Sequence, residues 1–170
     1  MRKITFFAVF IALSMLTYAQ TSYKQAIGMR LSSNTSYEAV AASYKFFVAQ
    51  PGAIELNLGF GNRDYWYNGD RRHAPGVSFA GTYQHHFAIK PVPGLKWFVG
   101  GGLVFFNTSA KVGRYDGFGA GIYPTGGIDY KFPKIPLNLS ADVRPVIHFT
   151  APDDYDTFHP TAGIAARYTF

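Results

Sequence analysis

Apolar and polar residues alternate along most of this chain. Between Leu137 and Phe149 every second residue is apolar or proline, while Asn138, Asp142 and Arg144 occupy positions in between. Successive side chains of a β-strand point to opposite faces, so a period of two predicts a strand with one apolar and one polar face. The pattern predicts an all-β protein with eight strands, because the same alternation recurs at approximately residues 23–31, 37–47, 53–60, 77–87, 95–106, 118–132 and 161–170.

The segments between these strands are of two kinds. The short ones contain proline, which fixes φ and donates no backbone hydrogen bond, so we expect tight turns. They lie at residues 50–52, 91–94 and 133–136. The longer segments are polar, and we expect loops at residues 61–76, 107–117 and 150–160. Because turns and loops alternate along the chain, all turns would lie at one end of the sheet and the loops at the other.

Eight two-faced strands fit two architectures, which differ in the direction of the apolar face. A soluble barrel turns this face inward around a ligand, whereas a membrane barrel turns it outward to lipid. The polar face of this chain is rich in Gly and Ser, which suit the narrow interior of an eight-stranded barrel. Many of the 16 Phe and 12 Tyr residues lie near strand ends, a pattern typical of aromatic girdles. We therefore predict an eight-stranded antiparallel up-and-down transmembrane β-barrel.

The N-terminal residues predict export. Arg2 and Lys3 precede a mainly apolar stretch from Ile4 to Leu16, and the small residue Ala19 follows, which is the order of a secretory signal peptide. The apolar stretch is shorter than the ~20 residues that a membrane-spanning helix needs. We predict that residues 1–19 are a cleaved signal peptide and that residues 20–170 form one barrel domain. The chain contains no Cys, which excludes disulfide bonds and thiolate metal sites.

The predicted last strand continues to an aromatic C-terminus. Tyr168 and Phe170 share the apolar face, and the segment ARYTF resembles the C-terminal recognition segment of bacterial outer-membrane barrels. The whole chain from about residue 22 onward resembles the eight-stranded barrels of the OmpA/OmpX type. This resemblance implies the outer membrane of a Gram-negative bacterium as the location. It also implies that the barrel-assembly machinery docks the last strand, with Tyr168 and Phe170 as the assembly signal.

Charged residues on the polar face predict a filled interior. An isolated ion in a low-dielectric wall costs many kcal/mol, so inward charges must pair or meet water. We expect a structural polar network, in preference to a gated ion path, formed by Arg30, Gln84, Asp129, Asp142, Arg144 and Arg167. Near the predicted turns we expect water to reach the side chains of Lys45, Lys96, Lys131 and Arg167.

Two prolines lie inside predicted strands. Pro124 and Pro145 fall on the apolar face at equal distances from the turn at 133–136, so a regular register places them opposite each other. Proline cannot donate to a strand ladder, and a closed barrel has no edge strand where this loss is harmless. The two positions predict either a local bulge or a lateral seam. The second interpretation resembles the lipid A palmitoyl-transferase barrels, in which prolines loosen strand pairing for lateral entry of lipid.

The predicted architecture favours a non-catalytic role in envelope integrity, with surface loops that contact ligands, lipopolysaccharide or other cells. Arginine binds phosphate through its planar fork. The candidate contacts for lipopolysaccharide phosphates are Arg63, Arg71, Arg72, Lys111 and Arg114. A lipid A-modifying enzyme with lateral access near the two prolines is the first alternative, and a narrow channel is the second.

Composition bounds the expected partners. The formal net charge is +6, and it falls to +4 when Arg2 and Lys3 leave with the signal peptide, without any basic run. We therefore expect no nucleic-acid partner. The expected partners are outer-membrane lipid, lipopolysaccharide and the barrel-assembly machinery, and the expected oligomeric state is a monomer. We expect no catalytic residues, no metal and no cofactor.

Overall fold

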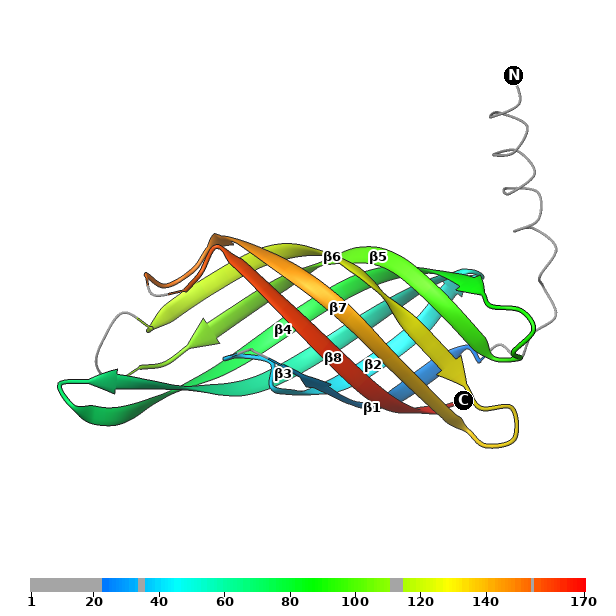
Figure 1. Ribbon diagram of the computed structural model, residues 1–170, viewed down its shortest axis with the longest axis horizontal. Coiled ribbons are helices and arrows are strands. Elements are labelled where there is room, and N and C mark those ends of the chain that lie inside the picture. The colour runs from blue at the N-terminus through cyan, green and yellow to red at the C-terminus, as the bar shows by residue number, and fades with distance from the viewer. Residues whose placement is uncertain (1–22, 34–35, 111–114, 154) are drawn as a thin grey trace, which may run out of the picture.

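The chain forms a closed barrel of eight antiparallel strands (Figure 1). The computed structural model describes residues 23–33, 36–110, 115–153 and 155–170, so the predicted signal peptide lies outside the described residues. Each strand pairs with its neighbours in sequence, and β8 also pairs with β1. The predicted number, order and closure of the strands are confirmed. The strands are β1 (Gln25–Ser32), β2 (Val40–Ala49), β3 (Gly52–Tyr67), β4 (Asp70–Ala88), β5 (Leu95–Thr108), β6 (Gly117–Lys131), β7 (Leu137–Thr150) and β8 (Phe158–Thr169).

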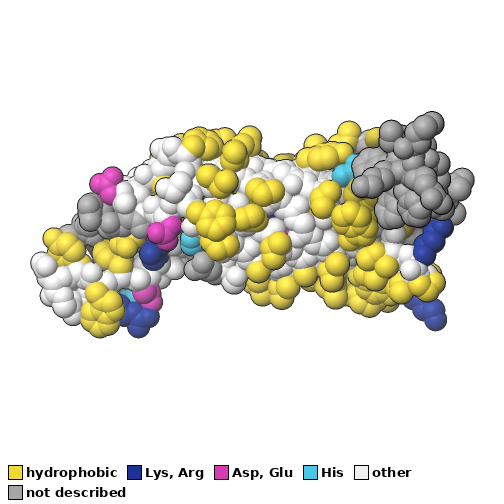
Figure 2. Space-filling view, turned by 45° about the horizontal axis from the view of Figure 1, so that its top comes forward, with side chains coloured by type: hydrophobic (Ala, Val, Ile, Leu, Met, Phe, Trp, Pro, Cys, Tyr) yellow, Lys and Arg dark blue, Asp and Glu magenta, His cyan; other side chains and the backbone are white. Residues whose placement is uncertain are grey.

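The apolar face of the wall points outward. In β7 the side chains of Leu139, Val143 and Ile147 are exposed, whereas those of Asn138 and Asp142 are buried. Figure 2 shows hydrophobic side chains spread over the wall and charged side chains gathered toward its two ends. A continuous apolar surface of this kind is typical of a barrel that faces lipid. Across the described part of the chain, no helix is long and apolar enough to cross a membrane.

The interior holds aromatic rings as well as polar groups. Phe106 and Tyr123 are buried inside the barrel, and each ring lies against an inward glycine. A Cβ atom on Gly119 would lie 2.1 Å from Cζ of Phe106, and one on Gly102 would lie 2.7 Å from Cζ of Tyr123. These distances are far below van der Waals contact, so the inward glycines make room for rings in a narrow lumen.

The first of the predicted long loops is instead a hairpin that extends two strands. β3 and β4 pair without interruption up to Tyr67 and Asp70, so the expectation of a loop at 61–76 is wrong. The turn consists of Asn68 and Gly69, with φ values of 51° and 84°. Asn-Gly is the dipeptide that best accepts two positive φ values, and it is a strong hairpin signal in a sequence. The other two predicted loops are confirmed for their described residues, since strand structure stops after β5 and after β7.

The hairpin projects past the rest of the wall, as Figure 1 shows for the joined ends of β3 and β4. β2 pairs with β3 only as far as Phe60, and β5 pairs with β4 only from Gly76. We call the projecting residues 61–74 the arm. Trp66 lies in the arm with 75% of its surface exposed, so it is not part of an aromatic girdle.

The two ends of the described chain meet at the opposite end of the barrel. Gln25 N donates to Phe170 O at 3.1 Å, and Phe170 N donates to Gln25 O at 2.9 Å. The pairing of β1 with β8 continues from there to Ser32 and Gly163. The wall therefore has no free edge along its length, which removes the unpaired backbone groups that hydrocarbon would not satisfy.

Candidate functional site

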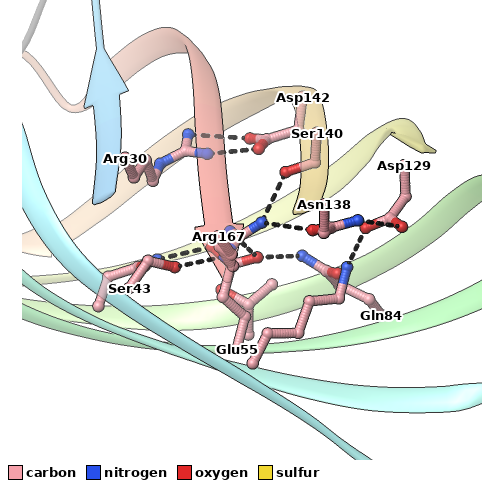
Figure 3. A network of polar contacts seen from close by, with 12 residues as sticks. Arg30, Ser43, Glu55, Gln84, Asp129, Asn138, Ser140, Asp142 and Arg167 are labelled. Carbon is pink, nitrogen blue, oxygen red and sulfur yellow. Dashed lines mark hydrogen bonds and ion pairs between the residues drawn. The ribbon is translucent and has the colours of Figure 1, made fainter. Parts of the chain in front are cut away.

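Glu55 lies at the centre of a polar network inside the barrel (Figure 3). Its carboxylate accepts hydrogen bonds from Arg144 Nη2 at 2.9 Å and from Gln84 Nε2 at 2.8 Å. Arg167 Nη2 lies 2.9 Å from the oxygen that Gln84 also contacts. These partners come from β7, β4 and β8, while Glu55 belongs to β3. The network therefore ties together strands from different sides of the wall.

A second carboxylate holds the part of the network nearer the arm. Arg30 Nη2 donates to Asp142 Oδ1 at 2.9 Å, its Nη1 donates to Oδ2, and Arg144 Nε donates to Oδ1 at 3.0 Å. Glu38, from the connection between β1 and β2, lies 3.4 Å from Arg30 Nε and 3.6 Å from Arg144 Nη1. Burial raises the pKa of Glu38, and the two arginines partly offset this effect. The strand predicted at residues 37–47 contains Glu38, but β2 begins only at Val40, so alternation did not place this side chain in the lumen.

The part of the network nearer the turns contains two cations that we expected to be hydrated. Lys45 Nζ donates to Asp129 Oδ2 at 2.5 Å, and Arg167 donates to Ser43 Oγ and to Ser140 Oγ, both at 2.8 Å. Lys45 and Arg167 are almost completely buried, so this expectation is wrong for both. The physical reason is that buried partners on other strands take the place of water.

Lys96 and Lys131, the other two cations that we expected to meet water, lie close to the turns as predicted. Lys131 and Lys96 are half-buried. Lys131 Nζ donates to the carbonyl oxygens of Phe132 at 2.6 Å and Ile135 at 2.9 Å. These contacts fasten the turn between β6 and β7 and leave Lys131 outside the central network.

The buried charges of the described residues balance. The four buried carboxylates are Glu38, Glu55, Asp129 and Asp142, and the four buried Lys and Arg side chains are Arg30, Lys45, Arg144 and Arg167. All six side chains predicted to form the network lie inside the barrel and take part in these contacts. A buried ion stripped of its partner costs several kcal/mol, so balance and hydrogen bonding allow this interior to stay closed.

Aromatic side chains close the lumen at the arm end. The ring of Tyr37 stacks on that of Phe106 with centroids 4.1 Å apart, and the Tyr37 hydroxyl lies 3.0 Å from His148 Nε2. His148 Nδ1 lies 2.7 Å from the carbonyl oxygen of Asp156 in the loop between β7 and β8. Tyr155 of the same loop lies 5.3 Å from the Phe106 ring. The loop therefore packs onto the top of the barrel interior.

The arm carries candidate phosphate contacts that already have acidic partners. Arg71 pairs with Asp64, and Arg72 Nη2 lies 3.1 Å from Asp70 Oδ2. His73 Nδ1 lies 2.6 Å from Asp64 Oδ1. Hydrogen bonds from Arg71 and His73 lower the pKa of Asp64. Because these pairs are exposed, they are weak, and a multivalent anion can compete for the arginines.

Arg63 takes a different position from the other arginines of the arm. Its guanidinium lies 4.9 Å from the ring centroid of Tyr115 and 5.6 Å from that of Tyr155. This cation–π contact anchors the arm to the loops beside it. Lys111 and Arg114, the remaining candidates, lie outside the described residues.

The ladder between β6 and β7 is interrupted at the two prolines. Ile122 pairs with Ile147 and Gly126 pairs with Val143, in the same register, but the three residues between them on each strand form no ladder pairs. Pro124 lies within this gap on β6 and Pro145 on β7. The same residues remain paired with β5 and β8 on their other sides. We call this gap the seam.

The direction of the backbone shows why the seam lacks hydrogen bonds. Lys131 N donates to Gly94 O on the β5 side. The backbone N–H and C=O groups of successive strand residues point alternately to the two neighbouring strands, so those of even-numbered residues in β6 point toward β7. His148 N donates to Thr157 O on the β8 side, so the backbone N–H and C=O groups of odd-numbered residues in β7 point toward β6. Pro124 and Pro145 therefore face each other at a position where a regular pair would exchange two bonds. Neither has an N–H, so neither carbonyl receives its ladder bond.

The predicted assembly signal lies on the outer wall. Tyr168 and Phe170 are exposed, and their rings stack with centroids 6.4 Å apart. Within the described ranges, no three His, Asp or Glu side chains cluster in an arrangement that could hold a metal ion. The polar network, the arm and the seam are the features of the described residues on which the functional proposals rest.

Comparisons with known proteins leave the family open. No protein-family model matches the chain, and no curated protein sequence matches it significantly. Among solved structures, the chain is similar to CarO2 of Acinetobacter baumannii, with 10% sequence identity and a TM-score of 0.45. The alignment covers 88% of this chain and 100% of CarO2.

Proposed function

We propose that this protein is a small, non-catalytic barrel of the outer membrane of a Gram-negative bacterium. It acts as a monomer, contributes to envelope integrity, and presents its arm and loops to ligands, lipopolysaccharide or other cells. One observation supports the proposal above the others: a closed wall is apolar on the outside while its lumen is filled with balanced charges. Such a barrel is suited to span a membrane and to display loops, because side chains of the described residues fill its interior.

The membrane assignment is tested by gel mobility and by solubility. The mature chain, extracted from outer membranes in detergent, should migrate faster in gels when unheated than after boiling, because the folded barrel stays compact. It should also precipitate when the detergent is removed. A mature chain that remains a folded monomer in plain buffer would show that the apolar wall faces water, and the assignment would fail.

The surface role is tested at the arm. Arg71→Gln combined with Arg72→Gln removes two exposed guanidinium groups whose acidic partners lie in the arm itself. We expect weaker binding of purified lipopolysaccharide and lower resistance of cells to detergent, since phosphate recognition depends on these forks. Lys134→Gln, an exposed cation in the turn between β6 and β7, is the matched control. Unchanged binding in the double variant would show that Arg71 and Arg72 of the arm do not bind lipopolysaccharide.

The seam supports a second candidate, a lipid A-modifying enzyme that lipid enters from the side. The interrupted ladder at Pro124 and Pro145 is the specific observation in its favour. Lipid A from cells with and without the gene should then differ in acyl composition by mass spectrometry. Identical spectra under several growth conditions would exclude the lipid A-modifying enzyme and keep the non-catalytic function.

A further inference from the structure

The end of the barrel opposite the arm, which we call the turn end, is basic. Five lysines lie in its turns or in the strand ends beside them: Lys24, Lys90, Lys96, Lys131 and Lys134. The acidic residue of this region, Asp129, is almost completely buried, and its carboxylate pairs with Lys45. The C-terminal carboxylate of Phe170 also lies at this end, where Phe170 pairs with Gln25. In the view of Figure 2, the turn end shows Lys or Arg side chains and no Asp or Glu.

The positive surplus of the chain is concentrated at the turn end. The buried charges of the lumen balance one another. The arm end does not supply the surplus, because five aspartates accompany three arginines among its described residues: Arg63, Arg71, Arg72, Asp64, Asp70, Asp116, Asp153 and Asp156. The chain without residues 1–19 nevertheless has a formal net charge of +4. Long-range attraction of an anion is therefore directed to the turn end.

Aromatic side chains on the outer wall set the depth of these lysines. Trp97 directly follows Lys96 and stacks on Phe87, with ring centroids 4.3 Å apart. Tyr130 directly precedes Lys131. Trp and Tyr on the wall of a membrane barrel lie at the boundary between hydrocarbon and head groups. Each of the two lysines lies one residue, about 3.3 Å, nearer the turns than its aromatic neighbour, so its long side chain reaches the level of the lipid phosphates.

Three of the lysines lie close together around the start of β5. Lys90 lies in the turn between β4 and β5, and Lys131 N donates to Gly94 O of the same turn at 2.9 Å, which brings the end of β6 beside Lys96. Lys90 is exposed, Lys96 Nζ lies 5.3 Å from the ring centroid of Phe47, and Lys131 Nζ donates to two carbonyl oxygens. None of these contacts involves a carboxylate, so the three charges remain available to an anion.

We propose that the turn end binds an anionic phospholipid, with its phosphate among Lys90, Lys96 and Lys131 and its acyl chains against Trp97 on the outer wall. Lysine binds phosphate as a point charge. A zwitterionic lipid brings a cation of its own, and the described residues around this site offer that cation no exposed Asp or Glu. The site therefore selects lipids with a net negative charge. This proposal rests on the proposed membrane location, requires no catalytic step and does not involve the seam.

The two Trp residues of the chain make the site directly measurable. Trp66 lies exposed in the arm, so Trp66→Phe leaves Trp97 as a single reporter beside the three lysines. The full mature chain with this change is folded into vesicles of phosphatidylglycerol and phosphatidylcholine in equal amounts, and either lipid in turn carries brominated acyl chains, which quench Trp fluorescence on contact. We expect about a fivefold preference for phosphatidylglycerol at Trp97, the ratio that an attraction of about 1 kcal/mol per lysine produces. The preference should fall as salt is added.

Three variants assign the preference to the lysines near Trp97. Lys90→Gln combined with Lys96→Gln should bring it close to one, and Lys90→Gln alone should give an intermediate value. Lys24→Gln is the matched control, because Lys24 is also an exposed lysine of the turn end but lies beside β1, across the barrel from β5. Lys90→Arg combined with Lys96→Arg keeps both charges and should keep the preference. The gel mobility of each variant reports the folded barrel.

The outcomes separate a lipid site from attraction by net charge and from a soluble partner. Equal quenching by both brominated lipids, or equal losses in the Lys24 and Lys90 variants, would overturn the proposal. So would binding of soluble polyglutamate to the barrel in phosphatidylcholine vesicles through Lys90 and Lys96 without any lipid preference, which would assign the turn end to an acidic protein segment. Quenching of Trp97 by either lipid reports contact of the wall with acyl chains, so the proposed membrane location is tested separately from the preference.

Discussion

At the scale of single residues, Glu55 determines how two of the three buried arginines of the lumen are held. Its two oxygens contact Arg144 and Arg167, each at 2.9 Å, and all three groups are buried. This carboxylate contributes more to stability than a carboxylate in a single ion pair would, because removing it leaves two guanidinium groups short of a partner. The inside of the barrel is therefore sensitive to single changes of charge.

Glu55→Gln should lower the free energy of unfolding by about 3–5 kcal/mol, the usual cost of breaking a buried ion pair from one side. Urea unfolding of the folded barrel in detergent micelles measures the change. Asp64→Asn is the control, because it breaks an exposed pair with Arg71 and should leave the unfolding midpoint unchanged. Similar midpoints for both variants would mean that water enters the lumen and screens its charges.

The direction of the charged side chains within the strands was predictable from the sequence, but the partner of each charge was not. Period-two alternation placed Arg30 and Asp142 correctly on the inner face. The pair that buries Lys45 joins it to Asp129, 84 residues away in the chain. Nothing local to Lys45 indicates this partner, because contact across a barrel depends on register and strand tilt.

At the scale of elements, the arm shows where alternation stops being informative. Beyond Phe60, β3 projects past the wall, so neither of its faces lines the lumen or the outer wall. The sequence therefore no longer alternates apolar with polar residues, although the strand continues. The Asn68–Gly69 turn was the signal that a hairpin is present, and the polar composition concealed it. The seam was more predictable, because a regular register around the turn at 133–136 brings its two prolines together.

Removal of the arm should leave the barrel intact. In this variant Asn62–Pro75 is replaced by an Asn-Gly turn, which leaves Gly61 opposite Gly76 and keeps every ladder pair between β3 and β4 inside the wall. We expect the heat-dependent gel mobility to be retained, because every ladder pair of the arm lies within the hairpin of β3 and β4. Loss of folded mobility would show that the contact of Arg63 with Tyr115 is needed to close the barrel.

At the scale of the whole molecule, lumen and wall have opposite chemistries. Figure 3 shows side chains from several strands meeting in the lumen, and Figure 2 shows the apolar surface outside. Tyr37 and Phe106 stack at the arm end, and Lys45 with Asp129 fills the turn end. Under the proposed membrane location, a barrel filled in this way can make contacts through its arm, its loops and its outer wall, and not through its lumen.

Purified protein in planar bilayers should therefore give no stable single-channel conductance. The buried charges of the described residues pair with each other inside the lumen, so we expect ions to find no continuous water path. Recordings over a range of voltages and salt concentrations check this expectation, with a known porin as the positive control. Reproducible conductance steps that Glu55→Gln alters would instead support the narrow-channel alternative.

The pairing of β8 with β1 makes the order of the strands around the wall circular. A single cut between Asn68 and Gly69 then divides the chain into two pieces, each with two complementary edges, β3 against β4 and β1 against β8. Co-refolded fragments should reassemble into one species with the mobility of the intact barrel, and boiling should separate it into two bands. The two fragments would then recognise each other along both of these strand pairs.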